Sequence, residues 1–204
     1  MTLLGAIIAG GKARRFGADK GAAQLGGVAL VDHVAHSLGV QCDDVVIVGR
    51  EWPGLLTIPD RPRAGEGPLG GLNAALHHAR RAGYGAVLCA GCDTLPVPGD
   101  LAALLGPGPA VVEGHWLMGH WPVALAEHLD RWLVDQPDRS IRGWMRHCDA
   151  RMVPLSQGPF HLHDYVAYVI EVTPLTQKGG TQIVIEDIMR RGGYQSEVKV
   201  RSDR

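Results

Sequence analysis

Residues suited to chemistry gather near the amino terminus, directly after an apolar run. Gly10 and Gly11 open this segment, and Arg15 and Lys20 lie further along it. Glycines let backbone N–H groups approach phosphate oxygens closely, while arginine and lysine supply positive charge. The order of residues matches neither the Gly-Lys-Ser/Thr nucleotide loop nor the dinucleotide pattern Gly-x-Gly-x-x-Gly. The segment Ile8–Lys20 therefore predicts a phosphate-binding loop of another kind, with a solvated basic loop as the alternative.

A carboxylate, Asp93, follows a second apolar run and is a candidate metal ligand. Mg²⁺ takes one or two protein carboxylates together with substrate phosphates, so a single carboxylate at a strand end suits it. The alternative role for Asp93 is a helix N-cap or an Asx-turn. Cys89 and Cys92 form a C-x-x-C just before it, but no second pair has matching spacing. Inert buried thiols are therefore favoured over a zinc or redox site.

Two further features could contribute to a binding site. Asp60 closes a short apolar run, and Gly65–Gly71 is a glycine-rich loop, including Gly70, ahead of an apolar helix. Such a loop lets main-chain groups contact a flat ligand, although an ordinary loop and helix start is the simpler interpretation. His77 and His78 lie on the predicted helix and are expected near solvent.

The order of predicted elements brings these candidates to one place. Strands are expected at Leu3–Ala9, Asp44–Val48, Leu55–Ile58, Gly85–Ala90, Ala110–Glu113 and Trp121–Leu125. Helices are expected at Val28–Gly39, Leu72–Ala82, Leu101–Leu105, Ala126–Leu133 and Ile141–His147. Strands that alternate with helices indicate an α/β fold with a mostly parallel central sheet and helices on both faces. Ligands of such sheets bind beyond the carboxyl ends of the strands. We therefore expect the Ile8–Lys20 loop, Asp60 and Asp93 at the same edge.

Composition narrows the classes of protein. The chain has 204 residues, of which 46% are hydrophobic and 20% charged, with a formal net charge of −1. These values are typical of a globular protein and show no basic excess for nucleic acid or an anionic membrane. The apolar amino-terminal stretch is too short to span a bilayer, and a cytoplasmic location is expected.

Four segments, in order, resemble one family, the molybdenum cofactor guanylyltransferases. They are Ile8–Lys20, Gly67–Gly71, Cys92–Pro96 and Gly119–Leu125. The resemblance covers residues 4–158. It implies a Rossmann-like nucleotidyltransferase fold and an enzyme that transfers GMP from GTP to Mo-molybdopterin, releasing diphosphate. It also implies Mg²⁺ as cofactor, and molybdoenzymes or their chaperones as partners that receive the finished cofactor.

The resemblance also implies roles for particular residues. Lys20, Arg15 and Asp93 would be catalytic, with Asp93 holding Mg²⁺. The nucleotide would be bound by Ile8, Ala9, Gly10, Gly11, Lys20, Asp60, Gly70 and Asp93.

The carboxyl-terminal part departs from the family pattern. The family ends with an Asn-x-Asn-Thr-Pro segment, whereas Val172–Pro174 carries neither asparagine. We therefore expect a nucleotidyltransferase domain over 1–160 and an atypical segment over 161–204, packed on the same domain. The alternatives are a cytidylyltransferase or sugar-phosphate nucleotidyltransferase of the same fold, or a non-catalytic nucleotide- or cofactor-binding protein. The pair Gly10-Gly11 favours guanine, because small residues leave room for a purine.

Overall fold

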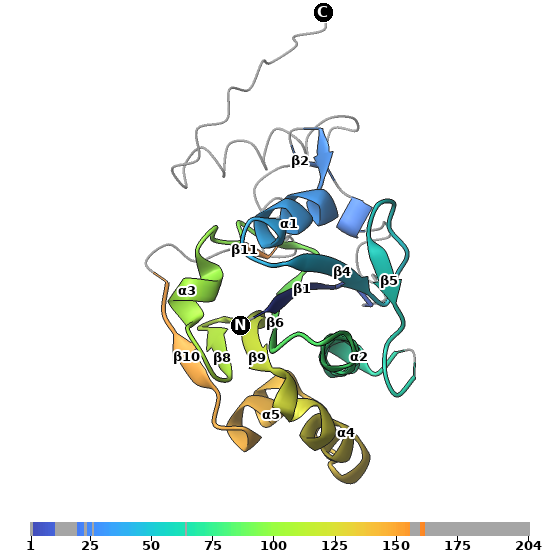
Figure 1. The fold of residues 1–204 in the computed structure, drawn as a ribbon, viewed down its shortest axis with the longest axis vertical. Helices are drawn as coiled ribbons and strands as arrows, with labels where there is room; N and C mark the ends of the chain where they lie inside the picture. Colours follow the sequence, from blue (N-terminus) through green and yellow to red (C-terminus); the bar gives the residue numbers. More distant parts are fainter. Residues whose placement is uncertain are drawn as a thin grey trace, which may run out of the picture.

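The structure is a computed structural model that describes residues 2–10, 20–22, 24–25, 27–63, 65–155 and 160–161. At its centre lies a seven-stranded sheet with the order β10-β8-β9-β6-β1-β4-β5 (Figure 1). Its strands are β1 (Leu3–Ile8), β4 (Asp44–Val48), β5 (Leu56–Ile58), β6 (Ala86–Gly91), β8 (Ala110–Val112), β9 (His115–Pro122) and β10 (Arg151–Val153). Strand β9 runs antiparallel to β6 and β8, and the other pairings are parallel. The predicted α/β fold with a mostly parallel sheet is confirmed.

Helices cover both faces of the sheet, as predicted (Figure 1). Helices α1 (Leu30–Gly39) and α3 (Leu101–Leu105) lie on one face. Helices α2 (Gly67–Ala82), α4 (Ala126–Asp135) and α5 (Ile141–His147) lie on the other. Short elements complete the described chain: the 3₁₀ turns Lys20–Ala22 and Val123–Leu125, and the two-residue strand pairs β2 (Gln24–Leu25) with β3 (Val28–Ala29) and β7 (Thr94–Leu95) with β11 (Phe160–His161).

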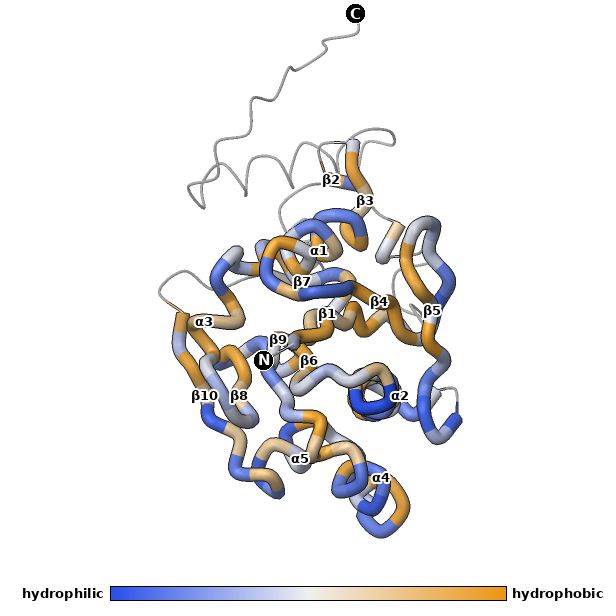
Figure 2. Tube along the Cα trace, in the orientation of Figure 1, coloured by the Kyte–Doolittle hydropathy of each residue, from blue (hydrophilic) through white to orange (hydrophobic). Residues whose placement is uncertain are grey.

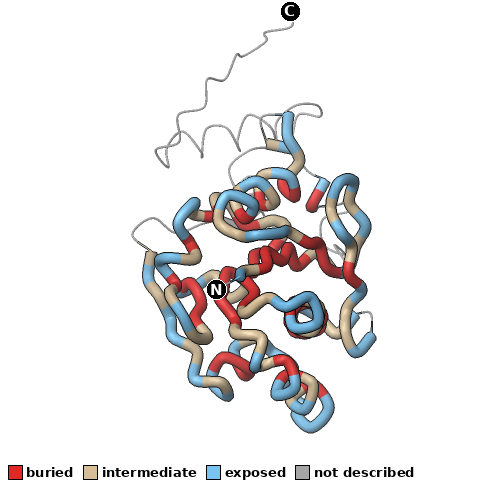
Figure 3. Tube along the Cα trace, viewed as in Figure 1, coloured by how far each residue is buried: buried red, intermediate tan, exposed pale blue. Residues whose placement is uncertain are grey.

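The central strands are buried on both sides, which explains why their sequences are continuously apolar. Successive side chains of a strand point to opposite faces, so Leu4, Ala6 and Ile8 of β1 join the core under α2 and α4. Ile7 of the same strand joins the second core, under α1 and α3. Figures 2 and 3 show these strands as the hydrophobic and buried centre of the molecule.

Helix α2 begins earlier than the sequence predicted. The stretch Gly65–Gly71 was expected to be a loop, but the helix starts at Gly67 and includes Pro68, Gly70 and Gly71. Proline is tolerated in the first turn of a helix, where its missing N–H would have no intrahelical partner. The glycines and the proline therefore predicted a loop where the structure has the first turns of a helix.

Two other predictions need correction. The strand expected at Trp121–Leu125 instead covers His115–Pro122, and a 3₁₀ turn follows it. Because β9 pairs with β6 on one side and β8 on the other, its mixed histidine and aromatic sequence still forms a strand. The helix expected from Val28 starts at Leu30, since Val28 and Ala29 pair with β2.

Within the described residues, no helix is both long and apolar enough to cross a membrane.

Candidate functional site

The carboxyl ends of four neighbouring strands are joined by main-chain hydrogen bonds. The N–H of Ala9, just after β1, donates to the carbonyl of Val48 at the end of β4, at 3.0 Å. The Cys92 N–H, just after β6, donates to the Ile8 carbonyl at 3.3 Å. Gly49 N–H donates to the carbonyl of Ile58, the last residue of β5, at 2.9 Å. The segments that follow these strands therefore start from one continuous edge, as the sequence predicted.

The carboxylate of Asp60 is packed against glycines from two other segments of this edge. A Cβ built on Gly10 would lie 2.9 Å from Asp60 Oδ2 and 3.0 Å from Oδ1, which is too close for a carbon atom. A Cβ on Gly71, in the first turns of α2, would lie 3.7 Å from Oδ1. The Gly65 N–H donates a long hydrogen bond to Oδ2, at 3.4 Å. Asp60 is thus brought beside Gly10, and it is half-buried.

Gly49 supports this arrangement from the end of β4. Its φ of +85° is in the left-handed region, where a residue with a Cβ is strained. A Cβ there would also lie 2.5 Å from Gly10 Cα and 3.1 Å from Asp60 Oδ1. Only glycine lets the two backbones approach this closely. Gly49 was not among the predicted site residues, although a glycine directly after a strand is the signal that could have identified it.

Gly70 and Gly71 face different parts of the site. A Cβ on Gly70 would lie 2.7 Å from Glu66 Cβ and 3.3 Å from the Arg61 carbonyl oxygen, so Gly70 packs against the loop that follows β5. A Cβ on Gly71 would contact Ile8 Cγ2 at 3.0 Å and lies on the Asp60 side. Of the two, Gly71 lies closer to the group formed by Ile8, Gly10 and Asp60.

Asp93 lies two residues beyond the end of β6. A Cβ on Gly91 would be 3.5 Å from Asp93 Oδ1 and 3.0 Å from Thr94 Oγ1. Asp93 is half-buried and follows Cys92, whose N–H is bonded to the end of β1. A single half-buried carboxylate at a strand end has the donor chemistry that Mg²⁺ uses when phosphates supply further oxygens. Within the described part of the chain, no three His, Cys, Asp or Glu residues gather as a metal-binding group.

Of the two cysteines that were predicted to be buried, Cys89 is buried and Cys92 is only partly buried. Cys89 is fully buried in β6, and burial raises the pKa of its thiol to about 12. Its Sγ donates to the Leu117 carbonyl at 2.9 Å. The thiol is therefore protonated and shielded at neutral pH, and reactive cysteines require the thiolate.

The chain matches known proteins over most of its length. A family model described as the MobA-like NTP transferase domain matches residues 5–152. A molybdenum cofactor guanylyltransferase of Cereibacter sphaeroides is 42% identical over 164 residues, which are 74% of this chain and 85% of the relative. One from Rhizobium leguminosarum bv. trifolii is 33% identical over 172 residues, 77% of this chain and 81% of the relative. The chain belongs to the family of MobA-like NTP transferases.

A solved structure gives the same fold. The molybdopterin-guanine dinucleotide biosynthesis protein A of Archaeoglobus fulgidus superposes with a TM-score of 0.62. The alignment covers 92% of this chain and 99% of that one, at 19% identity. This MobA-like chain is therefore a nucleotidyltransferase by family, with the Rossmann-like architecture that the sequence predicted.

Two predicted site residues of this MobA-like chain, Gly11 and Arg15, lie outside the described residues, as does nearly all of the segment 161–204. Lys20 is described only as the first residue of a 3₁₀ turn. The structure therefore brings together Ile8, Gly10 and Asp60 from the predicted set, while the phosphate-binding roles stay predictions. It also corrects His77, whose side chain was expected near solvent but is 12% exposed and lies against Asp130.

Proposed function

We propose that this chain transfers GMP from GTP to Mo-molybdopterin, forming the guanine dinucleotide cofactor and releasing diphosphate. The observation that carries the proposal is the 42% identity to a molybdenum cofactor guanylyltransferase along 85% of that relative. The edge built from β1, β4, β5 and β6 supports it, because nucleotides bind beyond the carboxyl ends of parallel strands.

The transfer needs no covalent enzyme intermediate. A phosphate oxygen of molybdopterin attacks the α-phosphorus of GTP, and a new phosphorus–oxygen bond forms. The bond from the α-phosphorus to the oxygen that bridges the β-phosphorus breaks, and diphosphate leaves with that oxygen. Catalysis of this kind is mainly positioning and stabilisation of charge.

Each residue of the site takes one of these tasks. Ile8, Ala9, Gly10 and Gly11 line the nucleotide loop, and Asp60 contacts the guanosine part. Arg15 and Lys20 hold phosphate oxygens through their positive charge. Gly70 contributes to nucleotide binding from the first turns of α2.

Asp93 is the residue that would hold Mg²⁺. The bound ion would offset negative charge on the triphosphate. The role of Asp93 is to fix that charge at the end of β6, beside the segment that follows β1.

The first experiment compares nucleotides by thermal stabilisation. Ligands that bind the native state raise its apparent stability by mass action, by about 2.7 kcal/mol at a hundredfold excess over Kd. We expect GTP with Mg²⁺ to raise the melting temperature more than CTP or UTP does. A larger shift with CTP would replace guanylyl with cytidylyl transfer.

The second experiment measures release of diphosphate from radiolabelled GTP in the presence of Mo-molybdopterin. We expect Asp93→Asn to lose Mg²⁺-dependent turnover while keeping its melting temperature. Asp100→Asn, the same charge change at an exposed position between β7 and α3, is the matched control and should keep full activity. Binding of GTP without diphosphate release by the wild type would support a non-catalytic carrier instead.

The cytoplasmic location and the partners that receive the cofactor stay predictions. Cell fractionation would test the location, and co-purification would test the partners.

A further inference from the structure

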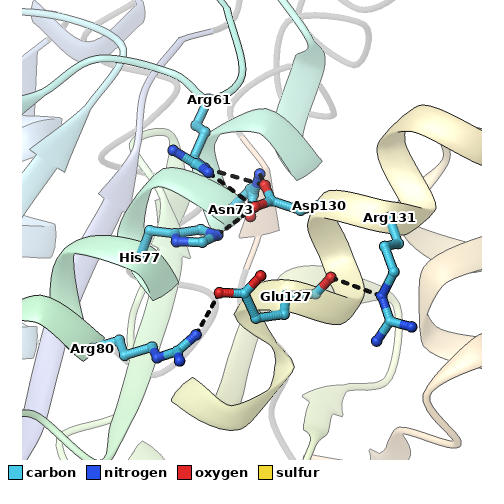
Figure 4. Close-up of polar contacts among 7 residues, drawn as sticks. All are labelled: Arg61, Asn73, His77, Arg80, Glu127, Asp130 and Arg131. Carbon is cyan, nitrogen blue, oxygen red and sulfur yellow. Dashed lines mark hydrogen bonds and ion pairs between the residues drawn. The ribbon is translucent and has the colours of Figure 1, made fainter.

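A polar cluster links helix α4 to the loop that follows Asp60 (Figure 4). Asp130 of α4 accepts two hydrogen bonds from the Arg61 guanidinium, from Nε at 3.1 Å and from Nη2 at 2.9 Å. Asn73 of α2 donates from Nδ2 to Asp130 Oδ1 at 2.7 Å. His77 Nε2, one turn further along α2, lies 2.9 Å from Asp130 Oδ2. A single carboxylate therefore accepts hydrogen bonds from Arg61 and Asn73 and lies next to His77.

The charge of Asp130 is strongly favoured at this position. The Arg61 guanidinium, through its hydrogen bonds, is the largest cause that lowers the pKa of Asp130 to about 2, and Asn73 adds to it. Paired hydrogen bonds between arginine and a carboxylate fix orientation as well as distance. Arg61 is thereby held in one direction by an ion that stays charged at neutral pH.

Arg61 is also bound through its main chain. Its N–H donates to the Gly70 carbonyl at 3.2 Å, so the residue is fixed at both backbone and side chain. Asp60 is the preceding residue and is the carboxylate packed against Gly10. Because Asp60 and Arg61 share a peptide unit, a shift of Arg61 displaces the Asp60 carboxylate from its place beside Gly10.

The other end of the same loop is held in a similar way. Glu66, at the start of α2, forms an ion pair with Arg139 from the segment between α4 and α5. Its side chain is largely buried, and Arg63 of the loop also pairs with it. The loop from Asp60 to Glu66 is therefore attached at both ends to the layer that contains α4.

We propose that Asp130 is a positioning residue of the nucleotide site, which acts through Arg61 to hold Asp60 in place for the nucleoside part of the substrate. The proposal rests on the proposed function, because Asp60 is there taken to contact guanosine. Helix α4 packs against α2 on the side away from the central strands (Figure 1). The proposal therefore gives α4 a role in substrate affinity.

The test is Asp130→Asn, which keeps the size of the side chain and removes its charge. We expect KM for GTP to rise roughly tenfold with kcat nearly unchanged, because a residue that acts on binding alone changes KM. A tenfold change corresponds to about 1.4 kcal/mol of binding free energy. A variant whose melting temperature falls while KM stays at the wild-type value would make Asp130 merely structural and overturn the proposal.

Glu127→Gln is the matched control. Glu127 lies on the same helix, three residues before Asp130, and pairs with Arg80 of α2 at 2.6 Å. Arg80 is in the last turn of α2, at the opposite end from the Asp60 loop (Figure 4). Removing this ion pair also loosens α2 from α4, but we expect it to leave KM for GTP unchanged. Equal increases of KM in both variants would overturn the proposal.

A double-mutant cycle tests whether Asp130 acts through Arg61. If it does, Arg61→Gln and Asp130→Asn together should raise KM no further than the larger single effect, because coupled residues are not additive. Effects that multiply would show independent roles and contradict the proposed pathway.

Amide hydrogen exchange gives a measurement that requires no nucleotide. In Asp130→Asn, the Arg61 N–H should exchange faster, while Glu127→Gln should leave it unchanged. A wild type that releases no diphosphate would defeat the proposed function, yet this exchange comparison would still decide the positioning role. Unchanged exchange of the Arg61 amide in Asp130→Asn would overturn that role directly.

Discussion

The contact between Gly49 and Gly10 gives the sharpest test of how this site is built. Gly49→Ala introduces a Cβ 2.5 Å from Gly10 Cα and 2.8 Å from Gly10 N. Both atoms belong to backbone, so the clash is relieved only if the two strand ends separate. The φ of +85° adds a second cost, because alanine is strained in the left-handed region.

The expected loss in the free energy of unfolding is the sum of these two costs. Left-handed backbone costs a residue with a Cβ about 1–2 kcal/mol, and overpacking in a tight site costs a further 1–3 kcal/mol. We therefore expect Gly49→Ala to lower the free energy of unfolding by about 3 kcal/mol. For a domain of this size each kcal/mol lowers the melting temperature by about 2–4 °C, so the expected loss is about 9 °C.

Gly54→Ala is the matched control for the backbone term. Gly54 has a similar φ, +79°, but a Cβ there would meet no atom within 4 Å. It should therefore lose only the left-handed cost, about 1 kcal/mol. Urea denaturation followed by circular dichroism measures both variants. Equal losses for Gly49→Ala and Gly54→Ala would refute the reasoning, since the contact with Gly10 would then contribute nothing.

Two further predictions follow from shifted pKa values. Because the pKa of Asp130 is lowered from 3.8 to about 2, its ionisation stabilises the fold above pH 3.8, and this stability is lost as the pH falls toward 2. Between pH 5 and 2 the wild type should lose about 1 kcal/mol more than Asp130→Asn, allowing for the partial exposure of Arg61; parallel denaturation curves would contradict this. Cys89, with a thiol pKa of about 12, should stay unlabelled by iodoacetamide at pH 8 in the native protein and be labelled after unfolding, as peptide mass spectrometry would show; native labelling would mean that β6 is accessible.

The strands were the most predictable part of the fold. Asp44–Val48 was predicted with the bounds that the structure gives, and the run at Leu3 with an end one residue too long. The buried residues of both strands are apolar, and a glycine follows each strand within two residues. Burial on both sides leaves a signal in the sequence itself, without knowledge of what packs on either face.

Elements whose stability comes from neighbours were harder to predict. Strand β9 contains histidine, tryptophan and glycine, and it is held by pairing with strands on both sides. The start of α2 looked like a loop, because Gly67, Pro68 and Gly70 are common in turns. These residues are helical because of contacts with the preceding loop. Helix propensity considers each residue locally and therefore cannot predict such contacts.

No local sequence pattern predicts the hydrogen bonds that Asp130 forms with Arg61 and Asn73. Asp130 meets Arg61 across 69 positions of sequence and Asn73 across 57. Each residue alone is typical of a solvated helix face or loop. The group becomes recognisable only when α2 and α4 are packed together, and His77 was assigned to solvent for the same reason.

Gly10 of the predicted nucleotide loop has two separate explanations, and the structure supports one of them directly. Gly10 was selected as a place where backbone could approach a phosphate. In the fold a Cβ on Gly10 would meet the Asp60 carboxylate, and the Gly10 backbone lies close to Gly49. The missing Cβ is thus already required by packing within the protein, before any ligand binds. Since Asp130 binds the guanidinium of the adjacent Arg61, the proposed positioning role predicts that nucleotide affinity at this edge also depends on α4.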